Sequence, residues 1–171
     1  MNLVDEAGER CLQLADGDPH DYARAIRGFP AIAHLRAGIR LKAAQTNARL
    51  EIELCDAGGH RPVRIMLTET GRIEAANGNA LADLGPYLPG DWITLSLTVD
   101  VPEQRYTAQV NQGPIVCLTL ADDSCHTVEY LSLRTGSWRG CAELAVTPVE
   151  HDHPLPVPAV FHLASVSMQP T

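Results

Sequence analysis

The feature that most constrains this chain is a strict alternation of apolar and polar residues over 92–110. In its first half, Ile93, Leu95, Leu97 and Val99 alternate with Thr94, Ser96, Thr98 and Asp100. A period of two is expected of a β-strand that buries one face. The alternation resumes at Tyr106 after the turn segment 102–104 and stops at the turn cluster 111–113. The sequence therefore predicts a β-hairpin over 90–113 that scaffolds a core, with Trp92 taken as a core residue.

The rest of the chain shows the same all-β pattern. Short alternating segments follow Gly, Pro, Asn and Asp turn signals, and no segment has a sustained helical period. Only 79–87 is expected to carry a short helical turn. About twelve strands without crossover helices predict an antiparallel two-sheet jelly-roll sandwich. The predicted strands are 10–15, 22–28, 32–42, 48–55, 62–68, 71–76, 92–100, 105–110, 114–120, 127–133, 141–147 and 158–168.

Length and composition narrow the class of protein. The 171 residues suit one domain, in which the proline-rich segment 147–158 is a surface connection to the last strand. A net charge of −8 argues against nucleic acid as a partner. No apolar run is long enough to span a membrane, and the N-terminus lacks a signal-peptide layout. We therefore expect either a cytoplasmic protein or an excised module of a larger bacterial one.

The five cysteines carry no metal-binding or redox signature. None of them forms a CxxC pair, so we expect reduced and mostly buried thiols. If one disulfide does form, Cys117 and Cys125 are the best-placed pair.

Two levels of family resemblance follow from these segments. The hairpin, with Trp92 at its start, an Asp at the end of its first strand and then YTAQVNQG, resembles the concanavalin A-like jelly rolls, including laminin G-like modules. Three further stretches are similar to the accessory sandwich of bacterial sialidase-like (BNR-repeat) proteins: CLQLADGDPHDYARAIRGFP, LEIELCDAGGHRPVRIMLTETGRIEAANG and EYLSLRTG. The resemblance implies a non-catalytic, carbohydrate-associated module whose partner is a polysaccharide or a neighbouring catalytic domain.

Two other functions stay open. Hydrolases of the same superfold carry a Glu-x-Asp-x-x-Glu strand, and Glu51 and Glu53 match its first pair without the spaced third acid. The Gln-x-His strand of alginate lyases is absent. A glycan-acting hydrolase or lyase using Glu51 and Glu53 is therefore one alternative. A structural domain that packs on a partner or oligomerises through a sheet edge is the other.

The charged residues of the middle strands are the main candidate site. If 32–42 and 48–55 form a hairpin, Arg40 and Arg64 flank Glu51, with Glu53 on the same face. Such a row is either cross-strand pairing that solvates the sheet or a ligand surface. Arginines would suit an acidic sugar.

Two loops add candidates. Asp16, Asp18 and Asp21 cluster oxygen ligands that suit a structural calcium, although Asx-type turns explain them as well. Trp138 and Arg139 lie in a loop between strands, so we take them as candidates for ligand or partner contact.

Overall fold

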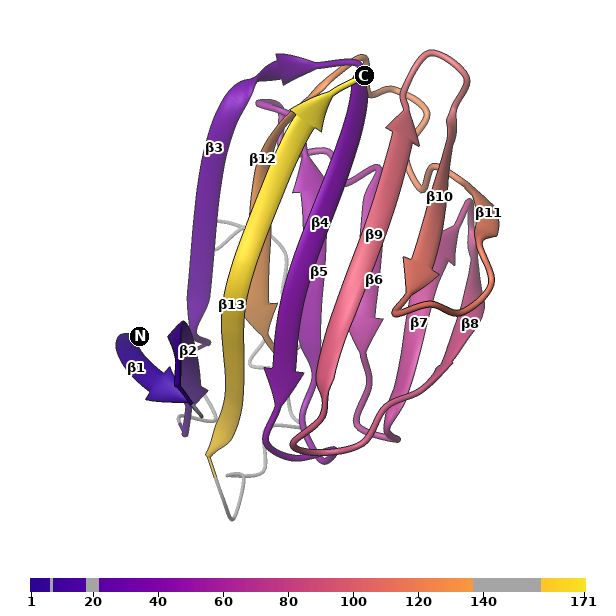
Figure 1. The fold of residues 1–171 in the computed structure, drawn as a ribbon. Helices are drawn as coiled ribbons and strands as arrows, with labels where there is room; N and C mark the ends of the chain where they lie inside the picture. Colours follow the sequence, from indigo (N-terminus) through magenta and orange to yellow (C-terminus); the bar gives the residue numbers. More distant parts are fainter. Residues whose placement is uncertain (7, 18–21, 137–157) are drawn as a thin grey trace, which may run out of the picture.

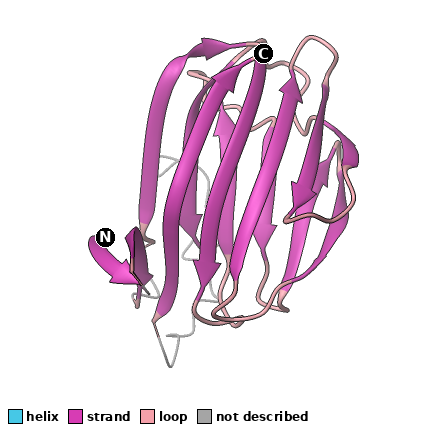
Figure 2. Ribbon diagram, in the orientation of Figure 1, coloured by secondary structure: helices cyan, strands magenta, loops and turns pink. Residues whose placement is uncertain are grey.

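The computed structural model describes residues 1–6, 8–17, 22–136 and 158–171. Within these stretches the chain forms thirteen strands and no helix (Figures 1 and 2). The strands build two antiparallel sheets, so the predicted all-β sandwich is confirmed, with one strand more than the expected twelve. No helix in the described part is long and apolar enough to cross a membrane.

The strands divide seven to six between the sheets. The seven-stranded sheet runs, in spatial order, β1 (Asn2–Glu6), β2 (Glu9–Asp16), β13 (Ala159–Pro170), β4 (His34–Ala43), β9 (Trp92–Asp100), β10 (Arg105–Val110) and β11 (Val116–Thr119). The six-stranded sheet runs β3 (Arg24–Ile32), β12 (Val128–Thr135), β5 (Leu50–Cys55), β6 (Val63–Leu67), β7 (Arg72–Asn77) and β8 (Ala80–Pro86).

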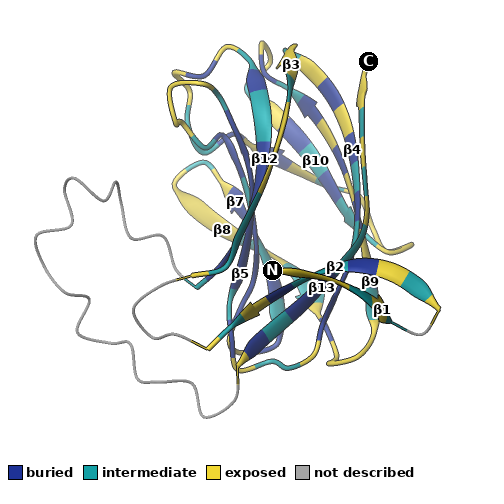
Figure 3. Cartoon of the chain, turned by 90° about the vertical axis from the view of Figure 1, so that its left-hand side faces the viewer, coloured by how far each residue is buried: buried dark blue, intermediate teal, exposed yellow. Residues whose placement is uncertain are grey.

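The core lies between the two sheets. Strand β9 turns Ile93, Leu95, Leu97 and Val99 inward, and β5 turns Leu50, Ile52 and Leu54 toward them from the other sheet. All seven side chains are buried (Figure 3). Burying such a side chain stabilises a fold by roughly 1.5–3 kcal/mol, so the alternation read from the sequence holds the two layers together.

The hairpin over 90–113 is confirmed. Strands β9 and β10 pair antiparallel from Asp100 opposite Arg105. Gln104 takes a positive φ of 53° in the turn, and its amide donates to the Val101 carbonyl at 3.0 Å. Trp92, in contrast, does not point into the core. Because Ile93 occupies the inward position, Trp92 lies on the outer side, where the Arg40 guanidinium carbon is 4.3 Å from its ring centroid.

Three further expectations were wrong or fall outside the described residues. The segment 79–87 forms strand β8 and not a helical turn. Strands 32–42 and 48–55 do not pair, because β4 lies in the seven-stranded sheet and β5 in the other. The expected strand 141–147 and the connection 147–158 lie outside the described part.

The described cysteines agree with the expectation of reduced thiols. Cys11, Cys55 and Cys125 are free and buried, and Cys117 is free and exposed, so Cys117 and Cys125 are not bridged. Burial raises the pKa of the Cys55 thiol to about 12. Cys141 lies outside the described residues.

Candidate functional site

The outer face of the six-stranded sheet carries an unusual density of charge. Since Leu50, Ile52 and Leu54 point into the core, the residues between them point outward. Strand β12 pairs with β5 so that Arg134 lies opposite Glu51, and β6 pairs so that Arg64 lies opposite Glu53. We call the following residues the charged face: Arg49, Glu51, Glu53, Arg61, Arg64 and Arg134.

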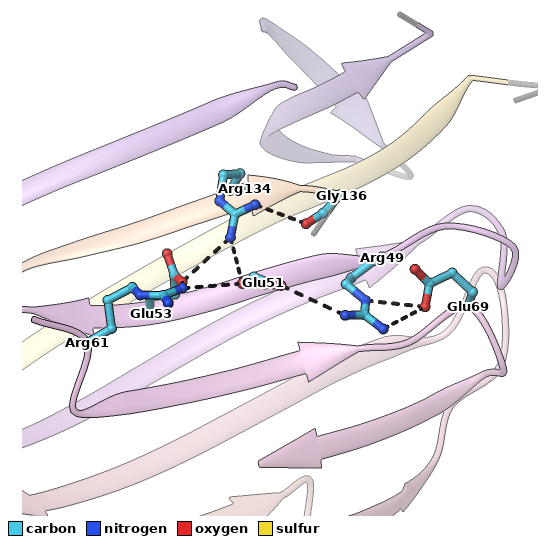
Figure 4. Close-up of polar contacts among 7 residues, drawn as sticks. All are labelled: Arg49, Glu51, Glu53, Arg61, Glu69, Arg134 and Gly136. Carbon is cyan, nitrogen blue, oxygen red and sulfur yellow. Dashed lines mark hydrogen bonds and ion pairs between the residues drawn. The ribbon is translucent and has the colours of Figure 1, made fainter. Parts of the chain in front are cut away.

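At its centre, two carboxylates and a guanidinium are buried together. Glu51 and Glu53 are 2% and 1% exposed, and Arg134 is 1% exposed. Arg134 Nη2 lies 2.6 Å from Glu51 Oε2 and 3.6 Å from Glu53 Oε1 (Figure 4). One buried arginine therefore bridges both glutamates across neighbouring strands.

Around this centre, two arginines reach toward solvent. Arg61 Nη1 lies 2.8 Å from Glu53 Oε1 and 3.9 Å from Glu51 Oε2. Arg49 Nη1 is 4.0 Å from Glu51 Oε1, and its Nη2 is 3.1 Å from Glu69 Oε2 (Figure 4). The side chains of Arg61 and Arg49 are 20% and 29% exposed, so the carboxylates hold them in place at the surface.

Burial has the largest effect on the pKa of Glu51. Loss of solvent raises the pKa of its carboxyl above the ordinary value of 4.5, and nearby Glu53 adds to the rise, while Arg134 and Arg64 oppose it. A buried ion pair of this kind is weak evidence for stability, because desolvation offsets the attraction between the charges. Carboxyls whose pKa is shifted in this way occur both in functional sites and in structural networks of ion pairs.

Arg64 differs from Arg49, Arg61 and Arg134 because, among the described residues, no carboxylate oxygen lies within 4.0 Å of its guanidinium. Its Nε is also buried and has no hydrogen-bond partner. Leaving such a donor unsatisfied costs about 1–3 kcal/mol. Arg64 lines a pocket of about 270 Å³ together with Gly59, His60, Arg61, Ala121 and Asp122. The Ala121 amide donates to the Pro62 carbonyl at 2.8 Å, which fixes the two loops that form the pocket.

Local hydrogen bonds shift the pKa values of two ionisable groups that line this pocket. His60 Nδ1 lies 2.7 Å from Asp56 Oδ2, and this contact raises the pKa of His60. Asp122 Oδ1 accepts from the Ser124 hydroxyl at 2.5 Å, which lowers the pKa of Asp122. The pocket therefore favours a cationic His60 beside Arg61 and Arg64, and an ionised Asp122.

The structure brings together only some of the site residues expected from the sequence. Glu51, Glu53 and Arg64 share the charged face, but the cross-strand neighbour of Arg64 is Glu53 and not Glu51. Arg40 lies on the opposite sheet, where it pairs with Glu9. The hairpin that placed Arg40 beside Glu51 does not form, because the chain crosses between sheets after β4. Trp138 and Arg139 lie outside the described residues.

Sequence reasoning missed Arg134 and Tyr22. Arg134 is 83 residues from Glu51, and no local pattern reports that β12 and β5 are neighbours. Its outward position in the alternating segment 130–135 was the available signal. Tyr22 is 38% exposed, and the Arg134 guanidinium carbon lies 5.8 Å from its ring centroid.

The calcium prediction stays a prediction. The Thr135 hydroxyl donates to Asp16 Oδ2 at 2.7 Å, whereas Asp18 and Asp21 lie outside the described residues. Over the stretches that the structure describes, no group of three or more His, Cys, Asp or Glu residues is placed to hold a metal ion.

With the fold and the charged face in place, comparison with known proteins decides the family. Residues 3–151 match the family model "Sialidase-like, CBM domain". The chain belongs to the sialidase-like carbohydrate-binding module family. No curated protein matches the chain. The expected resemblance to accessory sandwiches of sialidase-like proteins is confirmed.

Solved structures agree on the fold. A sialidase superposes with a TM-score of 0.82 at 23% identity, over 99% of this chain and 17% of its own length. An alginate lyase of polysaccharide lyase family 7 matches with a TM-score of 0.63 at 11% identity, over 96% of this chain and 81% of the lyase. Chicken galectin 2 matches with a TM-score of 0.59 at 10% identity, over 86% of this chain and all 100% of the galectin. The concanavalin A-like jelly roll is confirmed, and the chain spans about a sixth of the sialidase.

Proposed function

We propose that this sialidase-like carbohydrate-binding module is a non-catalytic recognition domain that binds a glycan on its charged face. The observation that carries the proposal is that carboxylates hold two partly exposed arginines in place: Arg61 donates to the buried Glu53 at 2.8 Å, and Arg49 donates to Glu69 at 3.1 Å. Arginine donors in a fixed fork suit the oxygens of sugars and their acidic substituents. Side chains that are already ordered lose little entropy on binding, which favours affinity.

Each residue has a distinct role in this proposal. As a binding module, the protein would use the buried Glu51 and Glu53 to position the arginines. Arg61, Arg49 and Arg64 supply the donors. Tyr22 supplies an exposed ring beside Arg134, and the apolar faces of sugars pack on such rings. A lactose-liganded congerin II shares the fold with a TM-score of 0.55, so sandwiches of this shape hold sugars.

Affinity electrophoresis tests the proposal. The intact protein is run through native gels containing a panel of neutral and acidic polysaccharides. We expect retardation by at least one polymer, weakened by Arg61→Gln. Arg36→Gln is the matched control, because Arg36 is an exposed arginine on the outer face of β4 in the other sheet. Retardation that Arg61→Gln leaves unchanged, or no retardation on the panel, overturns the proposal.

One observation favours a second candidate function. The raised pKa of Glu51 is a property of general acids in glycan-acting hydrolases and lyases. In such an enzyme Glu51→Gln would abolish release of reducing ends or of unsaturated products from a polysaccharide panel. Absence of any product with the intact protein removes this candidate.

A catalytic domain is the proposed protein partner. The support is the alignment of this whole fold with about a sixth of a sialidase. A pull-down with a sialidase-like catalytic domain, alongside glycan binding, tests it. Failure to associate leaves the glycan as the partner.

A further inference from the structure

We infer that the pocket beside the β5–β6 loop recognises an anionic substituent of a sugar, either a carboxylate or a sulfate, so that the module selects acidic over neutral glycans. The inference rests on the proposed function and specifies its ligand. The pocket is the one lined by His60, Arg61, Arg64 and Asp122, with Gly59 and Ala121 completing its wall.

The first argument is a surplus cation. On the charged face, Arg49, Arg61 and Arg134 each have a carboxylate oxygen within 4.0 Å. Arg64 has no hydrogen bond or ion pair among the described residues, and its Nε is buried without a partner. A guanidinium held in this way has donors to give to a ligand oxyanion.

The second argument is the ionic make-up of the pocket wall. The contact with Asp56 favours the cationic form of His60, and the Asp56 carboxylate balances that charge, so Arg64 is the lining cation without a carboxylate within 4.0 Å among the described residues. Asp122 is the one acidic side chain lining the pocket, and the Ser124 amide and hydroxyl donate to its Oδ1 at 3.1 and 2.5 Å. Its carboxylate repels an anion on that side and accepts hydrogen bonds from hydroxyl groups. An acidic sugar offers both chemistries on one ring.

The third argument is size. The pocket holds about 270 Å³, just under the roughly 300–1,000 Å³ of pockets that enclose drug-sized ligands. It therefore suits one sugar ring or its substituent, while the rest of a glycan chain crosses Arg61 toward Arg49.

Long-range attraction cannot substitute for this local site. The chain carries a formal charge of −8, so a polyanionic glycan is repelled by the molecule as a whole. Binding of an acidic polymer would therefore report the local arrangement of arginines.

The test is affinity electrophoresis of the whole protein on three matched polymers: a neutral glucan, a polyuronate and a sulfated glucan. We expect retardation by the polyuronate, the sulfated glucan or both, and at least about tenfold weaker binding for Arg64→Gln, the size expected for loss of one charged hydrogen bond. Arg36→Gln should bind as the parent does. Arg64→Lys keeps the positive charge but lacks the planar guanidinium, so its binding should lie between that of the parent and that of Arg64→Gln.

Each outcome has a distinct meaning. Retardation by only one of the two anionic polymers assigns the substituent as carboxylate or sulfate. Stronger binding to the neutral glucan, or unchanged binding of Arg64→Gln to the acidic polymers, overturns the inference while the proposed function stands. No binding to any polymer overturns both.

Discussion

The two outer faces of the sandwich follow the same alternation of residues, yet β5 and β12 of one face bury charged side chains, whereas β9 and β13 of the other carry exposed hydroxyls. On the six-stranded sheet, all six residues of β5 and the last five of β12 are buried, including the outward-facing ones. On the seven-stranded sheet, the outward residues of β9, Thr94, Ser96 and Thr98, are exposed, as are Ser165 and Ser167 of β13.

The difference shows which of the two faces holds its side chains in a fixed geometry. Exposed hydroxyls solvate a sheet face without fixing any geometry. Buried glutamates paired with arginines fix a geometry at the expense of desolvation. The charges of the seven-stranded face instead tie down the N-terminal hairpin, because Lys42 pairs with Glu6 and Arg40 with Glu9. The charged face is thus the better candidate for recognition.

The largest expected effect is at Arg134. Replacing it in Arg134→Met leaves Glu51 and Glu53 buried without their bridging cation. Breaking a buried pair in this way lowers the free energy of unfolding by about 3–5 kcal/mol. On the other face, Arg36→Met should change it by less than about 0.5 kcal/mol. Urea denaturation monitored by tryptophan fluorescence measures both.

A second substitution separates charge from packing at this site. Adding Glu51→Gln to Arg134→Met removes one of the two buried carboxylates that have lost their bridging arginine, so part of the lost stability should return. If Arg134→Met alone is nearly neutral, the two faces are equally tolerant and the contrast between them fails.

The contrast also explains what sequence reasoning recovered. The hairpin over 90–113 was predictable because its pairing is local and its alternation unbroken. The placement of Arg40 was wrong because alternation shows which side chains share one face of a strand, but not which sheet the strand joins. The short link 44–49 between β4 and β5 also looks like a hairpin turn. Glu53 and Arg64 were found because β5 and β6 are consecutive. Arg134 was missed because β12 is far from β5 in the sequence. Trp92 was wrongly assigned to the core, although the neighbouring Ile93 already occupied the inward position.

A smaller effect is expected where charge is buried on the seven-stranded face. Lys42 is 7% exposed, and its Nζ lies 2.5 Å from Glu6 Oε1. Glu6→Gln keeps a hydrogen-bond acceptor but removes the charge that faces Lys42, so the free energy of unfolding should fall, by less than it does for Arg134→Met. Exposed Glu103 provides the control, since Glu103→Gln should have little effect. A loss at Glu6 as large as that at Arg134 would show that both faces depend on charge equally.

The two faces should also respond to pH in opposite directions. Burial raises the pKa of Glu51, so the folded state binds its proton more tightly than the unfolded state. That contribution is present at low pH and is lost as pH rises from 4.5 through the folded pKa. Burial lowers the pKa of His162 on the outer side of β13, so its contribution is lost as pH falls below 6.5 through the folded pKa.

Variants make the opposite signs measurable. Glu51→Gln should flatten the stability profile above pH 4.5, and His162→Gln should flatten it below pH 6.5, each on the order of 1 kcal/mol. Thermal or urea unfolding from pH 4 to 8 gives the profiles. Identical profiles for the parent and both variants would mean that neither buried group titrates differently in the folded state.

The smallest effect is expected at Gly38, in the middle of the exposed face. A Cβ there would lie 2.7 Å from Ser167 Oγ, which is too close without a shift. The Ser167 hydroxyl is the end of an exposed side chain and accepts rotation, at the loss of its 3.4 Å contact with the Gly38 carbonyl. The gain from restricting the unfolded chain is about 0.4–1 kcal/mol, so Gly38→Ala should change stability by less than about 1 kcal/mol in either direction.

Adding Ser167→Ala to Gly38→Ala removes the close approach and should make the change stabilising. A face that tolerates a new methyl at its centre has no fixed geometry to protect, whereas a large loss at Gly38 would mean that the seven-stranded face is also built to a defined shape.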